Sequence, residues 1–278
     1  LRHAEALASE LTQARALGAE SLVVEIASND GYLLQFYKGR GVPVLGIEPA
    51  ANIARVAEAE RGIPTLCAFF GAELGERLRA EGRQADVIHA HNVLAHVADL
   101  NGVVQGIAAL LKPDGVAVIE APYVKDLIDH REFDTIYHEH LCYFSLTALD
   151  RLFARYGLVI ADVRRVPIHG GSLQIHAMRA ESASRGAAVQ ALLAEEAAWG
   201  VDDFAFYAGF ARAVEALRTD LRALLGSLKA QGKAIVAYGA SAKGSTLLNY
   251  FSIGGETLDF VADRSTYKQG RYTPGTHL

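Results

Sequence analysis

The sequence has few cysteines and no long apolar run. Its 278 residues include two cysteines, Cys67 and Cys142, too few for a disulfide framework or a four-cysteine zinc site within this segment. No apolar stretch approaches the roughly 20 residues that a membrane-spanning helix needs, and no signal peptide opens the chain. We therefore expect a cytoplasmic protein that does not bind membranes.

An excess of positive charge is missing as well. The 27 Lys and Arg residues are outnumbered by 32 Asp and Glu residues, which gives a formal net charge of −5 and excludes the basic footprint of a nucleic-acid-binding protein. Apolar residues make up 51% of the chain, enough for a sizeable core and for more than one domain. The chain begins at Leu1 rather than Met and stops at Leu278, so we expect natural sequence to be missing at both ends.

Short apolar runs alternate with helical segments in the first half of the chain. Strands that are almost entirely apolar indicate a parallel sheet covered by helices on both faces. We therefore predict an α/β fold whose first part is a doubly wound domain. The expected strands are 22–26, 42–47, 64–66, 86–89 and 115–120, with helices near 7–17, 52–60 and 100–111.

The pattern changes after Pro122. A strand over 158–166, a Gly-Gly turn and an alternating segment over 172–177 indicate an antiparallel hairpin that closes the sheet. Long helices are expected over 184–231, and a strand–turn–helix–strand unit from Lys233 opens another nucleotide-type α/β domain that is cut off before completion. The predicted domains are 1–182, a helical connector at 183–231, and an incomplete C-terminal domain at 232–278.

Ligands of doubly wound folds bind beyond the carboxyl ends of the strands, which here begins with the segment from Glu25 to Gly31. A dinucleotide site prefers G-x-G-x-x-G, and only Gly31 matches. A cationic ligand, such as the sulfonium and ammonium of S-adenosylmethionine, is better served by Glu25 and Asp30. Glu48 ends the second strand, where a carboxylate can accept both ribose hydroxyls. These residues favour S-adenosylmethionine over a pyrophosphate-bearing dinucleotide.

Aromatic and histidine residues follow the next two strands. Phe69 and Phe70 would enclose an adenine, or they are ordinary core residues. Three histidines lie between His89 and His96, but no carboxylate is spaced beside them as in H-E-x-x-H, so we expect no metal site. The predicted cofactor-binding residues are Glu25, Ala27, Asn29, Asp30, Gly31, Glu48, Pro49, Phe69, Phe70, His91 and Asn92.

Together with Leu-Lys-Pro-Asp-Gly at 111–115, these features resemble the class I S-adenosylmethionine-dependent methyltransferases, which have a Rossmann-like fold. The segment Tyr137-His138-Glu139-His140, followed by the glycine turns near 170 and 239, resembles the sugar C-methyltransferase family, which includes the C-3′-methyltransferase of D-tetronitrose biosynthesis. The resemblance implies methylation of a carbon of a nucleotide-linked 4-keto-deoxysugar. It also implies a methyltransferase domain followed by helices and a second, truncated Rossmann-like domain. The family's N-terminal zinc-binding domain, with clustered cysteines, is not in this chain.

The chemistry of carbon methylation is consistent with this resemblance. A carbanion equivalent is required, and a ketone supplies one as its enolate, given a base for the α-proton and a donor for the enolate oxygen. Histidine suits the base because its ordinary pKa is near 6.5, and the resemblance places the base at His140. Glu139 and Tyr137 would orient the base or the sugar. His96 would contact the sugar or the enolate oxygen.

The turn from Gly239 to Ser245 invites a P-loop interpretation, but its lysine precedes the glycine, unlike Walker A. A helix N-terminus with Ser241 and Lys243 can still hold a diphosphate; the alternative is a tight turn with a solvated lysine. The Gly170-Gly171 turn is either a plain hairpin or a place where substrate meets backbone. The predicted substrate-binding residues are Tyr143, His169, Gly170, Ser241 and Lys243.

Three other functions remain open. A nicotinamide-dependent (NAD or NADP) sugar oxidoreductase or epimerase is disfavoured by the missing glycines at Ala27 and Asn29. A non-catalytic module that binds S-adenosylmethionine is disfavoured by the presence of Glu139 and His140. A metal-dependent O-methyltransferase is the third alternative.

Overall fold

The structure is a computed structural model that describes residues 1–168 and 170–278. It divides into two compact units that interleave along the chain. The first unit consists of Leu1–Tyr123 and Leu141–Ala198, and the second of Val124–His140 and Trp199–Leu278. The domain bounds expected from the sequence, 1–182, 183–231 and 232–278, stay a prediction.

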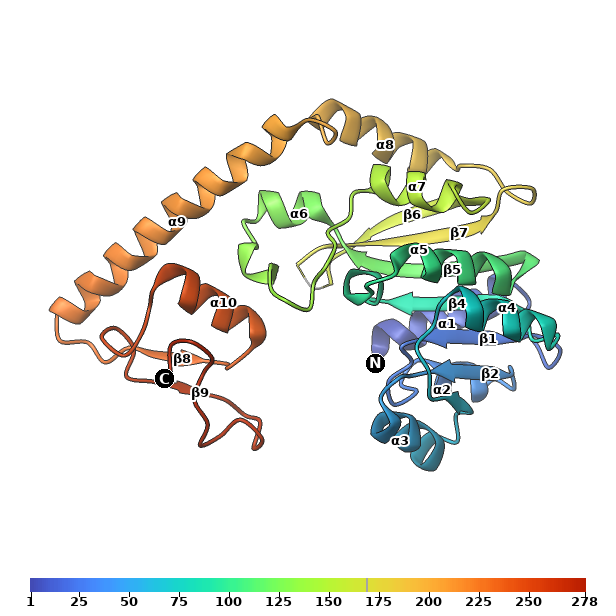
Figure 1. Ribbon diagram of the computed structural model, residues 1–278, viewed down its shortest axis with the longest axis horizontal. Coiled ribbons are helices and arrows are strands. Elements are labelled where there is room, and N and C mark those ends of the chain that lie inside the picture. The colour runs from blue at the N-terminus through green and yellow to red at the C-terminus, as the bar shows by residue number, and fades with distance from the viewer. Residues whose placement is uncertain (169) are drawn as a thin grey trace. The chain divides into compact units, whose positions relative to one another are not determined.

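The first unit is built on a seven-stranded sheet with the order β3-β2-β1-β4-β5-β7-β6 (Figure 1). Strands β1 to β5 pair in parallel, and β7 pairs antiparallel with both β5 and β6. The strand order reverses between β1 and β4, and the carboxyl ends at this switch point are the usual ligand site. The predicted α/β fold and the predicted hairpin are confirmed. The strands are β1 Val23–Ile26, β2 Val44–Ile47, β3 Thr65–Leu66, β4 Ala85–His91, β5 Leu111–Pro122, β6 Leu158–Val166 and β7 Ser172–Arg179.

Helices pack on this sheet through apolar stripes. In α1 (Arg2–Ala14) the buried positions are 4, 7, 8 and 11, one face of a 3.6-residue period, and they share a core cluster with Val23 of β1 and Tyr37 of α2 (Leu34–Lys38). Helices α4 (Ala72–Ala80) and α5 (Leu100–Leu110) run side by side (Figure 1). The two helices approach so closely that a Cβ at Gly75 would lie 2.5 Å from the Gly106 carbonyl oxygen. The glycine at this position therefore allows the contact. The remaining helices are α3 Ala51–Arg61, the 3-10 turn η1 Leu94–His96, α7 Leu146–Ala154 and α8 Ala187–Trp199.

The segment before the fifth strand differs from the expected turn. Strand β5 already begins at Leu111, paired with Ala85, and the next pair is Val87 with Val116. Between these two pairs, β5 has four residues and β4 has one. The additional residues of β5 therefore form a bulge. Lys112, in the bulge, donates to Asp86 at 2.8 Å, and this ion pair ties the bulge to the neighbouring strand.

The second unit has the parallel strands β8 (Val236–Tyr238) and β9 (Phe260–Ala262) with helices α6 (Val124–Asp129), α9 (Phe204–Ala230) and α10 (Ala242–Phe251). Its core includes Phe133, from the 3-10 turn η2 (Phe133–Thr135), whose ring stacks on Phe251 with centroids 4.7 Å apart. The predicted strand–turn–helix–strand pattern is present, but the helix begins three residues earlier than expected because the Ser241 hydroxyl caps it by accepting from the Gly244 amide. No helix in the described ranges is long and apolar enough to cross a membrane.

Candidate functional site

The turn after β1 concentrates left-handed backbone. Ala27, Asn29 and Gly31 have φ values of +54°, +49° and +77°, a conformation that costs non-glycine residues free energy and that clusters at functional sites. At Gly31 a Cβ would also lie 2.8 Å from Cγ1 of Ile63, so only glycine fits. The turn thus holds a backbone conformation that few residue types favour, at the carboxyl end of the sheet.

The Glu48 carboxylate holds this turn in place. It is buried at the end of β2, where Oε2 accepts from the Asn29 amide at 3.0 Å and Oε1 from the Ala50 amide at 2.9 Å. An ionised carboxylate has about four acceptor positions, so these two bonds orient Glu48 and leave capacity for hydroxyl donors. This arrangement suits the ribose contact predicted for Glu48.

Glu25 is the buried carboxylate of the site. It is 1% exposed, and its Oε2 atom has no hydrogen-bond partner in the described part of the chain. Burial raises the pKa of Glu25 well above its ordinary value, and the nearby carboxylates of Asp30 and Glu48 raise it further. A buried carboxylate with an unmet acceptor is costly in the isolated protein and becomes favourable when a cation is bound beside it.

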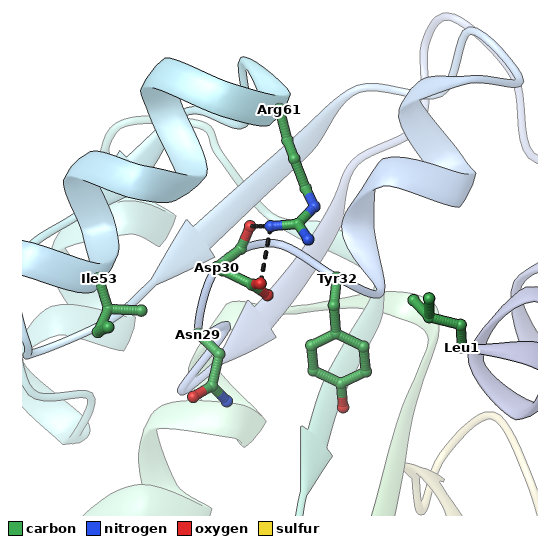
Figure 2. Close-up of a pocket in the computed structure, with 6 residues that line it drawn as sticks. All are labelled: Leu1, Asn29, Asp30, Tyr32, Ile53 and Arg61. Carbon is green, nitrogen blue, oxygen red and sulfur yellow. Dashed lines mark hydrogen bonds and ion pairs between the residues drawn. The ribbon is translucent and has the colours of Figure 1, made fainter. Parts of the chain in front are cut away.

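A pocket of about 570 Å³ opens beside the turn (Figure 2). Figure 2 shows Tyr32 and Asn29 on its wall, with Arg61 reaching Asp30 from α3. The Arg61 guanidinium contacts the Asp30 carboxylate at 2.8 Å and also donates to the Asp30 carbonyl at 2.6 Å. The charge of Asp30 is therefore paired with Arg61, which leaves Glu25 as the carboxylate better able to attract a cation.

A second pocket of about 220 Å³ shares Leu1 and Tyr32 with the first and is also lined by His91, Asn92 and Glu120. The Asn92 side-chain oxygen is buried and has no partner among the described residues. Burial raises the pKa of Tyr32 to about 12, assisted by Glu25, Glu120 and Asp30. Tyr32 therefore stays a neutral hydroxyl between the two pockets.

A chain of hydrogen bonds lies behind the second pocket. Its links join Tyr37 Oη to His89 Nε2 at 2.8 Å, His89 Nδ1 to His91 Nε2 at 2.9 Å, and His91 Nδ1 to Glu120 Oε2 at 2.9 Å. An ionised carboxylate can only accept, so with neutral rings each donor points toward Glu120. Both ring nitrogens of His91 are engaged in this chain, so His91, predicted to bind the cofactor, would meet it through a ring carbon or the ring face.

Glu120 collects two further donors, His3 Nε2 and Gln174 Nε2, each 2.7 Å from Oε1. Burial alone would raise the pKa of Glu120, but the bonds from His91, His3 and Gln174 outweigh it and lower the pKa to about 2. Glu120, His3, Tyr32 and Gln174 are not among the residues predicted from the sequence. A carboxylate inside an otherwise apolar strand is the available signal for Glu120.

The other residues predicted on this edge have varied settings. Phe69 is 85% exposed, whereas Phe70 is half-buried and lies against Gly106 of α5. Pro49 is half-buried between Glu48 and α3, and His96 is exposed at the end of η1. The roles assigned to these four residues stay predictions.

In the second unit, His140 is held by its own segment. Its Nδ1 atom lies 2.8 Å from the Thr135 carbonyl oxygen; because a carbonyl only accepts, Nδ1 carries the proton and the neutral ring keeps its lone pair on Nε2. The Tyr137 hydroxyl is 3.3 Å from that Nε2 atom. Glu139 lies 3.9 Å from the exposed His138 ring. The structure thus brings Tyr137 and His140 together.

The turn between β8 and α10 repeats the arrangement around Glu48. Asp263, directly after β9, accepts from the Ala240 amide and from the Ser265 amide, both at 2.7 Å. In the same way, Glu48 accepts from an amide of the turn after β1 and from the amide two residues further along its own segment. Hydrogen bonds from Ser265 and Ala240 lower the pKa of Asp263 below its ordinary value. Ser241 caps α10, and Lys243 is half-buried in the first turn of that helix.

The remaining predicted substrate residues belong to the first unit or lie outside the description. Tyr143 is half-buried and Gly170 is exposed with φ +88°. His169 lies outside the described residues.

Family models match nearly the whole chain. Residues 1–163 match a model described as a methyltransferase domain, and residues 167–278 match one described as the C-methyltransferase C-terminal domain. The C-methyltransferase NovU of Streptomyces niveus is 38% identical over 258 residues, which cover 92% of this chain and 61% of that protein. A ubiquinone biosynthesis O-methyltransferase of Methylobacterium sp. (strain 4-46) is 27% identical, covering 55% of this chain and 67% of the relative.

Solved structures share the fold at low identity. The magnesium protoporphyrin IX methyltransferase of Synechocystis PCC 6803 with bound S-adenosylhomocysteine has a TM-score of 0.51 at 16% identity, covering 64% of this chain and 82% of that chain. The PH0226 protein of Pyrococcus horikoshii OT3 has a TM-score of 0.51 at 14% identity, covering 64% and 90%. The first unit therefore has the Rossmann-like fold of the class I methyltransferases.

Proposed function

The chain belongs to the methyltransferase-domain family, and we propose that the protein is an S-adenosylmethionine-dependent C-methyltransferase acting on a nucleotide-linked 4-keto-deoxysugar. The match of residues 167–278 to the C-methyltransferase C-terminal domain and the similarity to NovU support carbon as the methylated atom. The chain spans 61% of the length of NovU, and the activity of the whole protein is part of this proposal.

The site on the first unit fits the cofactor. Four buried side-chain polar atoms have no partner in the described ranges, and three of them belong to this site: Glu25 Oε2, Ser28 Oγ and Asn92 Oδ1. All three can accept a hydrogen bond, and they lie in β1, on the turn after it or directly after β4, where a ligand with ammonium and hydroxyl donors would satisfy them. When bound, S-adenosylmethionine supplies a methyl group on a positively charged sulfur. Glu25 would favour that positive charge, and Glu48 would accept the ribose hydroxyls.

The observation that carries the proposal is the hydrogen bonding of His140. Its Nδ1–H is held by the Thr135 carbonyl, so Nε2 has the lone pair that a general base needs. We propose that the Tyr137 hydroxyl, which contacts Nε2 at 3.3 Å, gives up this contact to orient the bound sugar, and that Nε2 then takes the proton from the carbon next to the ketone. The electron pair of the broken C–H bond forms the enolate, whose carbon then accepts the methyl group. Glu139 would orient the base or the sugar, and His96 would contact the sugar or the enolate oxygen.

We assign the nucleotide side of the substrate to the second unit. Ser241 and Lys243 at the start of α10 would hold the diphosphate, and the likeness of Asp263 to Glu48 supports a ribose contact beside them. Tyr143, His169 and Gly170 would contact the sugar.

Solvent-deuterium exchange tests the base directly. The full-length protein is incubated in D₂O with a thymidine diphosphate-linked 4-keto-deoxysugar and S-adenosylhomocysteine, and deuterium at the carbon next to the ketone is measured by NMR. The wild-type protein should exchange this proton, and His140→Asn should slow exchange by about 10²–10⁴-fold, the usual contribution of a general base. His138→Asn, at the exposed neighbouring ring, is the matched control and should exchange like the wild type. Exchange at the wild-type rate in His140→Asn would move the base elsewhere; no exchange by the wild type would overturn the proposed function.

A further inference from the structure

Arg61, in the last turn of α3, reaches from the end of that helix to the turn after β1 (Figure 2). Its Nη1 atom contacts the Asp30 carboxylate at 2.8 Å and donates to the Asp30 carbonyl at 2.6 Å. The Lys38 ammonium donates to the Arg61 and Gly62 carbonyls at 2.9 Å each, so the backbone that carries the arginine is also held. Arg61 therefore has a fixed place opposite Asp30.

This ion pair forms part of the wall of the pocket of about 570 Å³, together with Asn29 and Tyr32. The Arg61 and Asp30 side chains are 25% and 39% exposed, so the pair is partly shielded from water. Charges in such a setting act on a ligand more strongly than fully exposed charges do. The charge state of this pair therefore contributes to the electrostatic potential inside the pocket.

Three carboxylates lie at this edge of the sheet: Glu25, Asp30 and Glu48. The charges of Asp30 and Glu48 add to burial in raising the pKa of Glu25, so Asp30 acts electrostatically on the site. The guanidinium of Arg61 is always protonated and offsets the charge of Asp30. Without the arginine, the turn would present an additional unpaired negative charge to a ligand.

S-adenosylmethionine and its product differ in charge at the sulfur. The methyl donor has a sulfonium and a net positive charge, whereas S-adenosylhomocysteine has a neutral thioether and no net charge. We propose that Arg61 is a specificity-determining residue of the cofactor pocket: by neutralising Asp30, it sets how strongly the site prefers the methyl donor over the product. The inference rests on the proposed placement of the cofactor beside the turn after β1.

The test is the ratio of the dissociation constant for S-adenosylhomocysteine to that for S-adenosylmethionine, measured by calorimetry on the full-length protein at low ionic strength. Arg61→Met leaves Asp30 unpaired and should raise this ratio about 3- to 10-fold. The rise should shrink in about 1 M salt, where the screening length falls to about 3 Å. Arg55→Met removes an exposed charge that bonds the Ala51 carbonyl of the same helix; it is the matched control and should leave the ratio unchanged.

A second pair of variants tests the charge of Asp30 directly. Asp30→Asn leaves Arg61 unpaired and should lower the ratio. The double variant of Arg61→Met with Asp30→Asn removes both charges and should return the ratio to the wild-type value. A turn that is merely loosened weakens both ligands alike, because they share every group except the methyl group and its charge, and leaves the ratio unchanged.

An unchanged ratio in Arg61→Met would overturn the inference, even with both affinities lower, because the arginine would then act on the shape of the turn or on the carboxylate that the two ligands share. A raised ratio that persists in the double variant would also overturn it, since Asp30 would not be the charge involved. Both outcomes are read from cofactor binding alone, so they are distinct from a failure of the proposed carbon methylation, which the exchange assay tests.

Discussion

The His91 ring lies 2.9 Å from the Glu120 carboxylate, its Nδ1–H donating to Oε2. Because the ionised Glu120 carboxylate only accepts, this bond sets the donor and the acceptor in each hydrogen bond of the chain that runs from Tyr37 to Glu120. His3 on α1 and Gln174 on β7 donate to the other oxygen of the same carboxylate. Glu120 therefore links four elements directly beside the smaller pocket.

Glu120→Gln should destabilise the first unit in a pH-dependent way. The pKa of Glu120 is about 2 in the folded protein against an ordinary value near 4.3 when unfolded. Its stabilisation is thus fully present above about pH 4.5 and is lost as the pH falls toward 2. The variant should be less stable by about 1–3 kcal/mol at pH 7, and the gap in urea-unfolding free energy should narrow below pH 4.5. A gap that is constant from pH 7 to pH 3 would contradict this account.

Glu25→Gln should stabilise the ligand-free protein while weakening its cofactor site. The pKa of Glu25 is raised in the folded state by burial and by the carboxylates of Asp30 and Glu48. Between the ordinary pKa of Glu25 in the unfolded chain and its raised pKa in the folded protein, the free energy of unfolding therefore falls as the pH rises. The ligand-free variant should melt at or above the wild-type temperature at pH 7.

The same variant separates charge from shape in cofactor binding. Because a bound cation favours ionised Glu25, calorimetry should show wild-type affinity for S-adenosylmethionine rising with pH through the raised pKa. Affinity in Glu25→Gln should be lower and should lack this rise. Equal affinities at every pH would remove Glu25 from the site.

Glu48→Ala should weaken binding of S-adenosylhomocysteine by about 1–3 kcal/mol, since ribose hydroxyls would lose their acceptor. The change also frees the Asn29 and Ala50 amides that Glu48 now bonds, so the turn after β1 should loosen. Glu60→Ala, at an exposed position of α3, is the control and should bind like the wild type. Calorimetric affinity that is unchanged in Glu48→Ala would exclude the ribose contact.

Lys243→Ala should raise the KM for the sugar nucleotide and leave cofactor affinity unchanged, because its charge would pair with the diphosphate. Lys233→Ala, exposed before β8, is the matched control. Steady-state kinetics with the sugar nucleotide varied at saturating S-adenosylmethionine provides the measurement. A raised KM for the methyl donor instead would reassign the turn.

Apolar periodicity sufficed to predict the sheet. Val23, Leu45 and Ile88 lie in short runs that are almost entirely apolar, and such runs must be covered on both faces of a sheet. The alternation of apolar and polar residues from Leu173 to Ala177 predicts the antiparallel hairpin that β6 and β7 form. The bulge after Leu111 was not predictable, because a Lys-Pro-Asp-Gly sequence is typical of a free turn and its pairing depends on Asp86 of another strand.

The carboxylates of the site were predictable in part. Glu25 lies inside β1 and Glu48 directly follows β2, so their position follows from the strand pattern alone. The pairing of Asp30 with Arg61 depends on a residue 31 positions away, and the donors of Glu120 come from residues as far apart as His3 and Gln174. Such partners are set by tertiary packing, which local pattern does not contain.

The interleaving of the two units has a consequence for the order of folding during synthesis. Phe133 leaves the ribosome 118 residues before Phe251, on whose ring it stacks in the core of the second unit. Until α10 has been made, the segment around Phe133 has no complete native core to enter. A nascent chain paused before residue 251 should thus expose this segment to proteases and chaperones. Contacts so distant in sequence also slow folding, so completion of the second unit should be the late step.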